Sequence, residues 1–290
     1  MDIKLLRWFK KWFLGQHIFY LSDKKHLVRN YRKRMGKRLN LKNPRFFTEK
    51  LQWLKLNWRC DMLTRCTDKY EVRKFVEERV GPELLKEFYG VYNKVEDIDI
   101  SRFPNAFVLK TTHGCKQNIF CKNKSDFAWK SSADLLKKYL KSSHYRLHRE
   151  WSYKNIVPRV ICEEHLTKNG ETMYEYQFYC YDGIPRLVQI RTETAGETRV
   201  SMFDLDLNLL EGNKNLKPLS APVTKPVQFE KMLEYASELS RDFPFVRVDL
   251  FHVKNRVYFG EMTFYPAGGF CPIDPESSDL LMGSYLKLPR

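Results

Sequence analysis

Two apolar runs near the C-terminal end of the chain constrain its fold more than any other feature. The runs, "FVRVDL" at 245–250 and "VYFGEMT" at 257–263, alternate apolar with polar residues, and a short polar segment separates them. Alternation with a period of two, interrupted by a turn, is typical of a β-hairpin with one buried face. The sequence therefore predicts an antiparallel pair in which every residue has a defined cross-strand partner.

The register of this hairpin places four polar side chains together. If residues 254–256 form a three-residue turn, Asp249 pairs with Glu261 and Arg247 pairs with Thr263. Opposed carboxylates about 5 Å apart repel each other, so a stable sheet retains them only with a cation or a proton between them. Magnesium prefers carboxylate and phosphate oxygens, and we predict that it binds here. The alternative is an exposed hairpin whose two-residue turn shifts this register.

A second group of residues has the character of a polyphosphate site. Lys69 follows an aspartate, and Lys110 ends the apolar strand "FVLK". The loop after that strand, "TTHGCKQN" at 111–118, contains His113, Gly114 and Lys116. Lysines and backbone amides are the groups that bind a polyphosphate, although this loop is not a Walker A motif. Taken alone, each lysine is equally compatible with an ordinary solvated surface charge.

A third feature is the run "VICEEHL" at 160–166, an apolar strand that ends in Glu163 and Glu164. A strand that leaves the sheet in this way can present a carboxylate and backbone groups to the edge of a purine. Two solvated glutamates at a strand end are the alternative interpretation.

The remaining pattern indicates an α+β protein. Strands are predicted at 107–110, 118–122 and 158–163, a hairpin at 174–192 turns at Asp182-Gly183, and helices are predicted at 131–141 and 229–240. Helices and strands alternate while the recognisable turns join antiparallel strands, which is the α+β pattern. The length of 290 residues accommodates one large domain or two smaller ones.

The positive charge is concentrated at the N-terminus. The chain has a net charge of +16, and residues 1–50 contain fifteen Lys and Arg against three acidic residues. Within residues 1–45, the runs 4–13 and 26–38 combine basic with apolar or aromatic residues, which favours an amphipathic helix on an anionic membrane surface. A helical cap that packs on the main domain is the alternative. Nucleic acid is disfavoured because no DNA- or RNA-binding motif accompanies the charge.

Cysteine usage and hydropathy indicate the compartment. The seven cysteines are scattered, odd in number and without a C-x-x-C pair, which is typical of reduced thiols. No run of about 18 apolar residues is present, so no membrane-spanning helix is predicted. We expect a cytoplasmic protein, held peripherally at the inner face of the plasma membrane by residues 1–45.

Taken in order, six segments resemble the TupA-like branch of the ATP-grasp superfamily. They are "FTEKLQWLKL", "DKYEVRKFV", "FVLKTTHG", "EWSYKNIVPRVICEEHL", "FPFVRVDLF" and "YFGEMTFYPAGGF". The resemblance implies an ATP-grasp fold, in which two α+β lobes hold ATP between antiparallel sheets. It extends over residues 46–290, with a nucleotide-binding lobe at about 100–165 and a metal-binding, catalytic lobe at 166–290.

The resemblance also implies roles for individual residues. Lys69 and Lys110 would hold the phosphates of ATP together with the loop residues His113, Gly114 and Lys116. Glu163 would receive the adenine amino group, with Glu164 and Leu166 beside it. Arg247 would act on the acyl-phosphate, and Asp249, Glu261 and Thr263 would surround magnesium. Thr263 stands where most ATP-grasp enzymes have Asn, and Gln177 stands where a lysine is expected.

The function implied is an ATP-dependent carboxylate–amine ligase that works through an acyl-phosphate in the synthesis of bacterial cell-surface polysaccharide. Its substrates would be ATP, a saccharide that bears a carboxylate, such as a uronic acid, and an amino acid or other amine. Two alternatives remain. A glycosyltransferase would use the D-x-D element Asp204-Leu205-Asp206, and an inactive ATP-grasp-like protein would serve as a membrane-associated scaffold.

Overall fold

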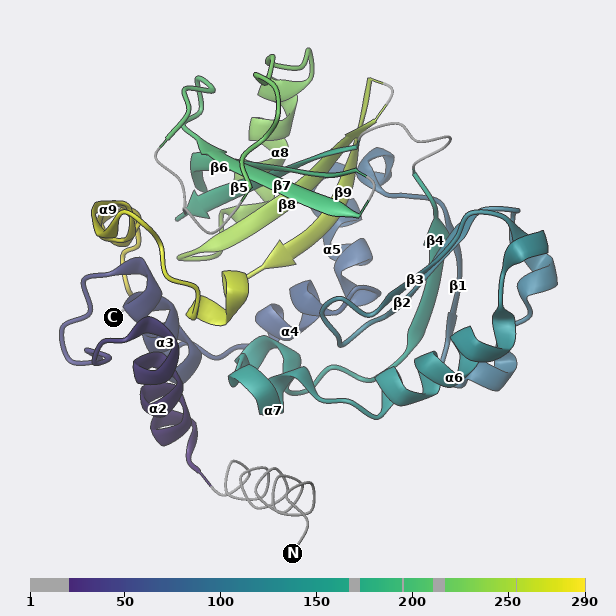
Figure 1. Ribbon diagram of the computed structural model, residues 1–290, viewed down its shortest axis with the longest axis horizontal. Helices are drawn as coiled ribbons and strands as arrows, with labels where there is room; N and C mark the ends of the chain where they lie inside the picture. The colour runs from purple at the N-terminus through teal and green to yellow at the C-terminus, as the bar shows by residue number, and fades with distance from the viewer. Residues whose placement is uncertain (1–20, 167–172, 195, 211–216, 254, 290) are drawn as a thin grey trace, which may run out of the picture.

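The computed structural model describes residues 21–166, 173–194, 196–210, 217–253 and 255–289. These residues form two antiparallel sheets that occupy different parts of the molecule, with helices around both (Figure 1). The α+β class expected from the sequence is therefore confirmed. The run at 4–13 lies outside the described residues.

The smaller sheet has the strand order β1-β4-β2-β3. Its strands are β1 (Phe88–Tyr92), β4 (Val160–Glu164), β2 (Phe107–Thr111) and β3 (Asn118–Cys121). One face is covered by α6 (Trp129–Leu140), whose Leu136 is fully buried in a core that also contains Phe107, Leu109 and Val160. The sheet thus has a hydrophobic core of its own, and it includes a strand that precedes residue 100.

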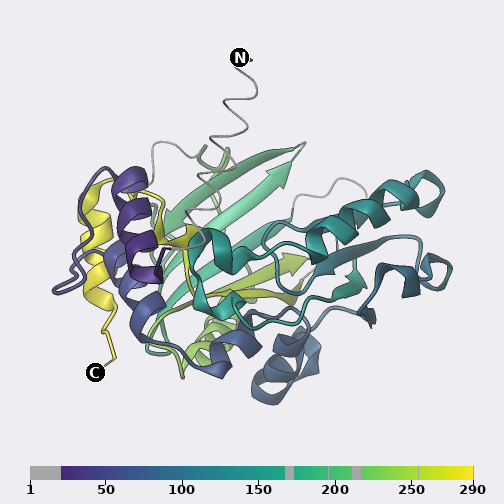
Figure 2. The same ribbon diagram turned by 90° about the horizontal axis from the view of Figure 1, so that it is seen from below.

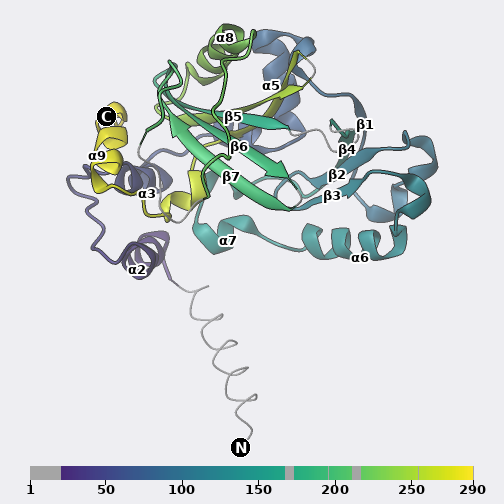
Figure 3. The same ribbon diagram turned by 45° about the horizontal axis from the view of Figure 1, so that its top comes forward.

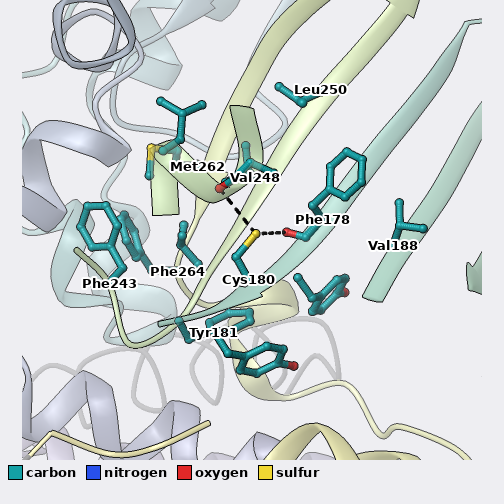
Figure 4. Packing of buried hydrophobic residues seen from close by; sticks show 14 of the residues in the cluster. Phe178, Cys180, Tyr181, Val188, Phe243, Val248, Leu250, Met262 and Phe264 are labelled. Atoms are coloured by element: carbon teal, nitrogen blue, oxygen red, sulfur yellow. Dashed lines mark hydrogen bonds between the residues drawn. The ribbon is translucent and has the colours of Figure 1, made fainter. Parts of the chain in front are cut away.

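The larger sheet has the strand order β7-β6-β5-β8-β9. Its strands are β7 (Glu197–Phe203), β6 (Ile184–Thr194), β5 (Tyr174–Tyr181), β8 (Val246–Val253) and β9 (Arg256–Thr263). Helix α8 (Phe229–Ser240) packs on its outer face (Figure 3). At this contact the sulfur of Cys180 lies 3.5 Å from the carbonyl oxygen of Phe178 (Figure 4) and 3.7 Å from that of Ala236, and either oxygen can accept its single hydrogen.

The β8–β9 hairpin differs from its predicted form at the turn. Val253 pairs with Arg256, so two residues separate the strands instead of three. A β-bulge at Gly260 adds one residue to β9 and restores the predicted pairing beyond it. A Cβ on Gly260 would lie 2.7 Å from the carbonyl oxygen of Asp249, which explains the glycine. The predicted turn was wrong, but the predicted pairing of Asp249 with Glu261 is present.

Four helices from the first part of the described chain and one helix from its end make up a third group of elements. It consists of α2 (Asp23–Met35), α3 (Phe47–Asn57), α4 (Asp61–Thr67), α5 (Glu71–Val80) and α9 (Glu276–Tyr285). Figures 1 and 2 show α3 beside the C-terminal α9, and α2 packs against α3. Tyr31 of α2 is fully buried, and its hydroxyl forms a hydrogen bond of 2.9 Å with that of Thr48. The second basic run therefore packs on the rest of the molecule along one side of its helix.

Short elements complete the chain. They are α7 (His144–His148) and the 3₁₀ turns η1 (Pro82–Leu84), η2 (Val95–Asp97), η3 (Ile100–Arg102), η4 (Lys124–Asp126), η5 (Trp151–Tyr153) and η6 (Pro266–Gly269). In Figure 3, α7 and α6 lie along the side of the molecule opposite to α8. None of the helices that the structure describes is long and apolar enough to cross a membrane.

Candidate active site

Four polar side chains project from one face of the β8–β9 hairpin. Arg247 donates to both carboxylate oxygens of Asp249, from Nε to Oδ1 at 2.7 Å and from Nη2 to Oδ2 at 2.6 Å. The same Nη2 lies 3.7 Å from Oε1 of Glu261. The hydroxyl of Thr263 donates to Oε1 of Glu261 at 3.0 Å and accepts from Arg247 at 3.4 Å. The alternation of the two strands places all four groups on this face.

The opposed carboxylates of Asp249 and Glu261 require a cation beside them, and the guanidinium of Arg247 supplies it. Burial raises the pKa of Asp249, and the ion pair with Arg247 opposes that effect. Burial lowers the pKa of Arg247, but the charge of Asp249 more than offsets it, so the pKa is raised well above its ordinary range. The charged forms of Asp249 and Arg247 therefore stabilise each other. The repulsion between Asp249 and Glu261 is relieved by Arg247 in this structure.

The oxygen atoms around the hairpin fit magnesium bound together with a nucleotide. The side chain of Glu261 is 44% exposed, so its carboxylate is accessible. Gln177 donates from Nε2 to Asp249 at 3.2 Å, while its Oε1 is buried without a hydrogen-bond partner. Mg²⁺ is commonly held by one or two carboxylates plus phosphate oxygens and water, so a closed set of protein ligands is not needed. Among the described residues no cluster of three His, Cys, Asp or Glu forms such a closed set.

The smaller sheet brings two lysines to one carboxylate. Lys110 on β2 and Lys86, just before β1, both form ion pairs with Oε1 of Glu163 on β4, the second at 3.0 Å. Burial raises the pKa of Glu163, but the two lysine charges outweigh it and hold the pKa well below its ordinary value. Burial lowers the pKa of Lys86 to about 8. The carboxylate predicted to receive adenine is thus engaged by two cations in this structure.

Lys69 lies at the loop after β2. Asp68 accepts hydrogen bonds from the backbone N–H groups of Tyr70, at 2.8 Å, and Glu71, at 3.3 Å, and so caps the start of α5. An ion pair of 2.9 Å between Asp68 and Arg159 ties this helix to the chain entering β4. The ammonium group of Lys69 then donates to the carbonyl of Gly114 at 2.9 Å.

The other loop residues surround this contact. A Cβ on Gly114 would lie 2.8 Å from the hydroxyl of Thr111 and closer still to the amide of Gln117, so a larger residue there would require these side chains to move. His113 is 4% exposed, and burial lowers its pKa, which keeps the imidazole neutral. Lys116 is exposed with a positive φ of 58°, which turns the loop. Glu164 and Leu166 are half-buried at the end of β4.

Electrostatic coupling joins the two groups of residues into one site. Burial raises the pKa of Glu261, but the charges of Lys69, Arg247 and Lys110 help to lower it below its ordinary value. Lys110 belongs to the smaller sheet and Lys69 contacts the loop after β2, whereas Glu261 and Arg247 belong to the larger sheet. Lys69 and Lys110 thus lie within electrostatic range of Glu261 on the hairpin.

The sequence did not predict two residues of this region as part of the site. Lys86 stands among apolar residues in "LLKEF", and no local pattern connects it with a glutamate 77 positions further on. Tyr153 lies within electrostatic range of Glu150, Glu261 and Arg247. Its only sequence signal is its place in "EWSYKN", within one of the segments that resemble the ATP-grasp family.

Two antiparallel sheets, one with Lys110 and the other with two carboxylates and an arginine, agree with the ATP-grasp class expected from the sequence. The sequence pattern of the family described as TupA-like ATPgrasp matches residues 49–287, and the chain belongs to that family. The expected family is therefore confirmed, as are the ATP-grasp fold and the use of ATP and Mg²⁺ as the cofactors of this class. No curated protein matches the sequence.

Several solved ligases are similar in structure. D-alanine–D-alanine ligase from Bacillus anthracis, complexed with ATP, is 13% identical with a TM-score of 0.39, over 70% of this chain and 55% of that one. The Helicobacter pylori enzyme is 15% identical with a TM-score of 0.39, over 77% and 61%. L-amino acid ligase from Bacillus licheniformis is 12% identical with a TM-score of 0.41, over 71% and 42%. The chain thus spans between about two fifths and three fifths of these proteins, and similarities of this size do not identify a substrate.

Proposed function

We propose that the protein is an ATP-dependent ligase that joins a carboxylate to an amine through an acyl-phosphate. The observation that carries this proposal is the convergence of Lys69 and Lys110 with Arg247, Asp249 and Glu261 between two sheets. Three lysine or arginine cations beside two carboxylates suit a substrate whose phosphates carry negative charge and a divalent ion. A binding module for an uncharged ligand would have no use for this set of charges.

Each side chain has a task in this reaction. Asp249, Glu261 and Thr263 would hold Mg²⁺, which would offset negative charge on the phosphates of ATP. Lys69 and Lys110 bind phosphate oxygens, and Glu163, supported by Glu164 and Leu166, positions the adenine end. Arg247 stabilises the negative charge that develops on the carboxyl oxygen during transfer. We assign nucleotide binding to a lobe at about residues 100–165, to which Lys69 adds a phosphate contact, and metal binding and catalysis to a lobe at residues 166–290.

The carboxylate substrate in this proposal is a uronic acid of a bacterial cell-surface polysaccharide or of its precursor, and the amine is an amino acid or a similar compound. Membership of the TupA-like family supports this choice. The assay is the formation of ADP with D-glucuronate as carboxylate and L-glutamate, glycine or hydroxylamine as nucleophile. The proposal requires that ADP formation depends on both substrates and that hydroxylamine yields a hydroxamate.

The two alternatives have distinct outcomes in the same assay. Turnover of a UDP-sugar without ATP would indicate the glycosyltransferase, and no turnover with either nucleotide would indicate the scaffold. The D-x-D element gives the first alternative little support, because Asp204 is engaged in a turn. Its carboxylate accepts from the backbone of Asp206, at 3.0 Å, and from that of Asn208, at 2.8 Å.

We also propose that the protein binds the cytoplasmic surface of an anionic membrane through residues 1–45. Helix α2 buries Leu27 and Tyr31, but its other sides expose basic residues. The exposed basic residues of the described part of this segment are Lys24, Lys25, Arg29, Arg32, Lys33, Arg34, Arg38, Lys42 and Arg45.

Vesicle sedimentation tests this membrane proposal. Changing Lys24, Lys25 and Arg29 to Gln should weaken binding to anionic vesicles by about 3 kcal/mol, at about 1 kcal/mol for each basic residue near the surface. The control changes three exposed lysines elsewhere, at 122, 130 and 141. Equal sedimentation of both variants and the unaltered protein would contradict the proposal.

A further inference from the structure

The loop between β2 and β3, residues 112–117, has a side chain that crosses it. We call this loop the phosphate loop, because its residues are proposed to hold the phosphates of ATP. The amide of Gln117 fills the space that a side chain at Gly114 would occupy. Its Oε1 accepts a hydrogen bond from the hydroxyl of Thr111, and the backbone N–H of Thr111 donates to the carbonyl of Gln117 at 3.3 Å. The base of the loop is therefore closed by both backbone and side chain.

The same amide also reaches the end of α6. Its Nε2 donates to the hydroxyl of Ser142 at 2.8 Å, and that hydroxyl donates to the carbonyl of Tyr139 at 2.7 Å. Helix α6 is itself fixed to the smaller sheet, because its Leu136 is fully buried in the core of that sheet. A continuous series of hydrogen bonds thus runs from β2 through Gln117 to the end of a helix that the core holds in place.

The first half of the phosphate loop has anchors of a different kind. Lys69 donates from its backbone N–H to the carbonyl of Thr112 at 3.3 Å and from Nζ to the carbonyl of Gly114 at 2.9 Å. Thr112 donates from its N–H to the carbonyl of Arg159 and from its hydroxyl to the carbonyl of Val157, both at 2.9 Å. These contacts fasten the first half to the segments that enter α5 and β4, whereas the second half has Gln117 as its side-chain anchor.

ATP acts differently on the two side-chain anchors. A phosphate oxygen is charged and accepts a stronger hydrogen bond than a peptide carbonyl, so bound ATP competes with Gly114 for the ammonium group of Lys69. The amide of Gln117 is neutral and its Nε2 is directed at Ser142. The link between Gln117 and Ser142 can therefore persist while Lys69 turns to the nucleotide.

An anchor of this kind bears directly on nucleotide affinity. A loop that binds phosphate through its backbone has to lose conformational freedom, and fixing each residue costs free energy. Glycine has the most freedom to lose, and residues 112–117 contain only one glycine. A loop that is already held before ATP arrives avoids part of this cost.

We infer that Gln117 is a positioning residue that, through Ser142, holds the phosphate loop in the conformation that binds ATP. Gln117 acts on the backbone of the loop, and Ser142 acts on Gln117 from the end of α6. This inference rests on the proposed assignment of the loop to the phosphates of ATP. It extends the nucleotide site to a residue outside the loop.

The experiment compares Gln117→Ala, Ser142→Ala and the double variant with the unaltered full-length protein. Calorimetry measures the Kd for ATP with Mg²⁺ and without a carboxylate substrate. Each single variant should raise this Kd about three- to tenfold, as for one lost hydrogen bond. The double variant should match the single variants, because two residues of one series act as a unit.

Turnover supplies a second readout. With D-glucuronate and hydroxylamine, the KM for ATP should rise in parallel with the Kd, while kcat at saturating ATP stays within about twofold. This is the pattern of a residue whose loss weakens substrate and transition state equally.

Hydrogen exchange gives a readout that needs neither ATP nor turnover. In the nucleotide-free protein, the backbone amides of residues 113–116 should exchange faster in both single variants, while those of β5 stay unchanged. Ser142→Thr keeps the hydroxyl and should retain the affinity for ATP. Ser131→Ala is the matched control, because it removes an exposed serine hydroxyl at the other end of α6.

The outcomes distinguish this inference from the function on which it rests. A weaker affinity in Gln117→Ala with unchanged affinity in Ser142→Ala would mean that Gln117 contacts ATP itself, and would overturn the positioning role. Additive losses in the double variant, or unchanged affinity in both single variants, would overturn it as well. ATP binding without hydroxamate formation would refute the ligase function alone, whereas no ATP binding by the unaltered protein would refute the nucleotide site and the positioning role together.

Discussion

The two lysines that share Glu163 lead to a sharp prediction about stability. Glu163→Gln removes one negative charge from a group in which the side chains of Glu163 and Lys86 are 7% and 6% exposed and that of Lys110 is 17% exposed. Removing one member of a buried ion pair costs about 3–5 kcal/mol, because the remaining charge is left without a partner. For a chain of this size that loss corresponds to a fall in melting temperature of about 5–8 °C.

The loss of unfolding free energy caused by Glu163→Gln should become smaller as the pH rises. Burial lowers the pKa of Lys86 to about 8 in the folded protein, below the ordinary value of 10.5. In the variant the attraction of Glu163 is gone, so the pKa of Lys86 falls further. The unfolded chain then binds more protons than the folded one over a wider range, and the free energy of unfolding rises with pH. The deficit at pH 7 should therefore shrink toward pH 10.

Thermal and urea unfolding of three variants at pH 7 and pH 9.5 tests this reasoning. Glu164→Gln is the matched control, because this neighbour is half-buried and forms no ion pair with any described residue. The double variant Glu163→Gln with Lys86→Met should regain much of the loss, since an apolar replacement of a buried pair is often neutral. If Glu163→Gln were as stable as Glu164→Gln at pH 7, the two lysines would not depend on Glu163 and the argument would fail.

The remaining predictions concern the hairpin, the nucleotide and the buried lysine of α3. Asp249→Asn should abolish turnover. It should also lower the free energy of unfolding, measured with urea, by about 3–5 kcal/mol, because Arg247 loses its buried partner. Glu261→Gln should abolish turnover with a stability change below about 1 kcal/mol, since its side chain is 44% exposed, and near-normal turnover would reject it as a metal ligand. Lys110→Ala should weaken ATP binding by about 1.5–3 kcal/mol, and an unchanged affinity in calorimetry would exclude the phosphate contact. Burial lowers the pKa of Lys55 to about 7, so between pH 7 and pH 10.5 only the unfolded chain keeps the proton on this lysine. The free energy of unfolding should therefore rise with pH over this range, and Lys55→Met should reduce that rise.

The hairpin illustrates how a correct pairing can follow from an incorrect turn. The alternation of β8 and β9 is visible in the sequence, and it identifies the residues on each face. The turn contains two residues instead of three, and the bulge at Gly260 compensates for the difference. The sequence marks the bulge only by a glycine, because the reason for it is a contact with the carbonyl of Asp249 on the neighbouring strand.

For the basic run at 26–38, the charge pattern is visible in the sequence but the packing of the helix is not. Its charge and its apolar positions are evident in the sequence, and both membrane binding and packing agree with them. Only the fold decides that Leu27 and Tyr31 are buried, since the surface that covers them includes Phe270 from the far end of the chain. The exposed basic residues of α2 lie on the sides that this contact leaves free.

The strand faces, the α+β class and the resemblance to the ATP-grasp family could be predicted before the structure was known, because they depend on local periodicity and on motifs in a fixed order. The tertiary structure alone decided which charges neutralise one another. Lys86 reaches Glu163 across 77 positions, and Arg247 occupies the place between Asp249 and Glu261. Such pairings depend on distance and burial in the folded chain, and neither quantity is a property of a local segment.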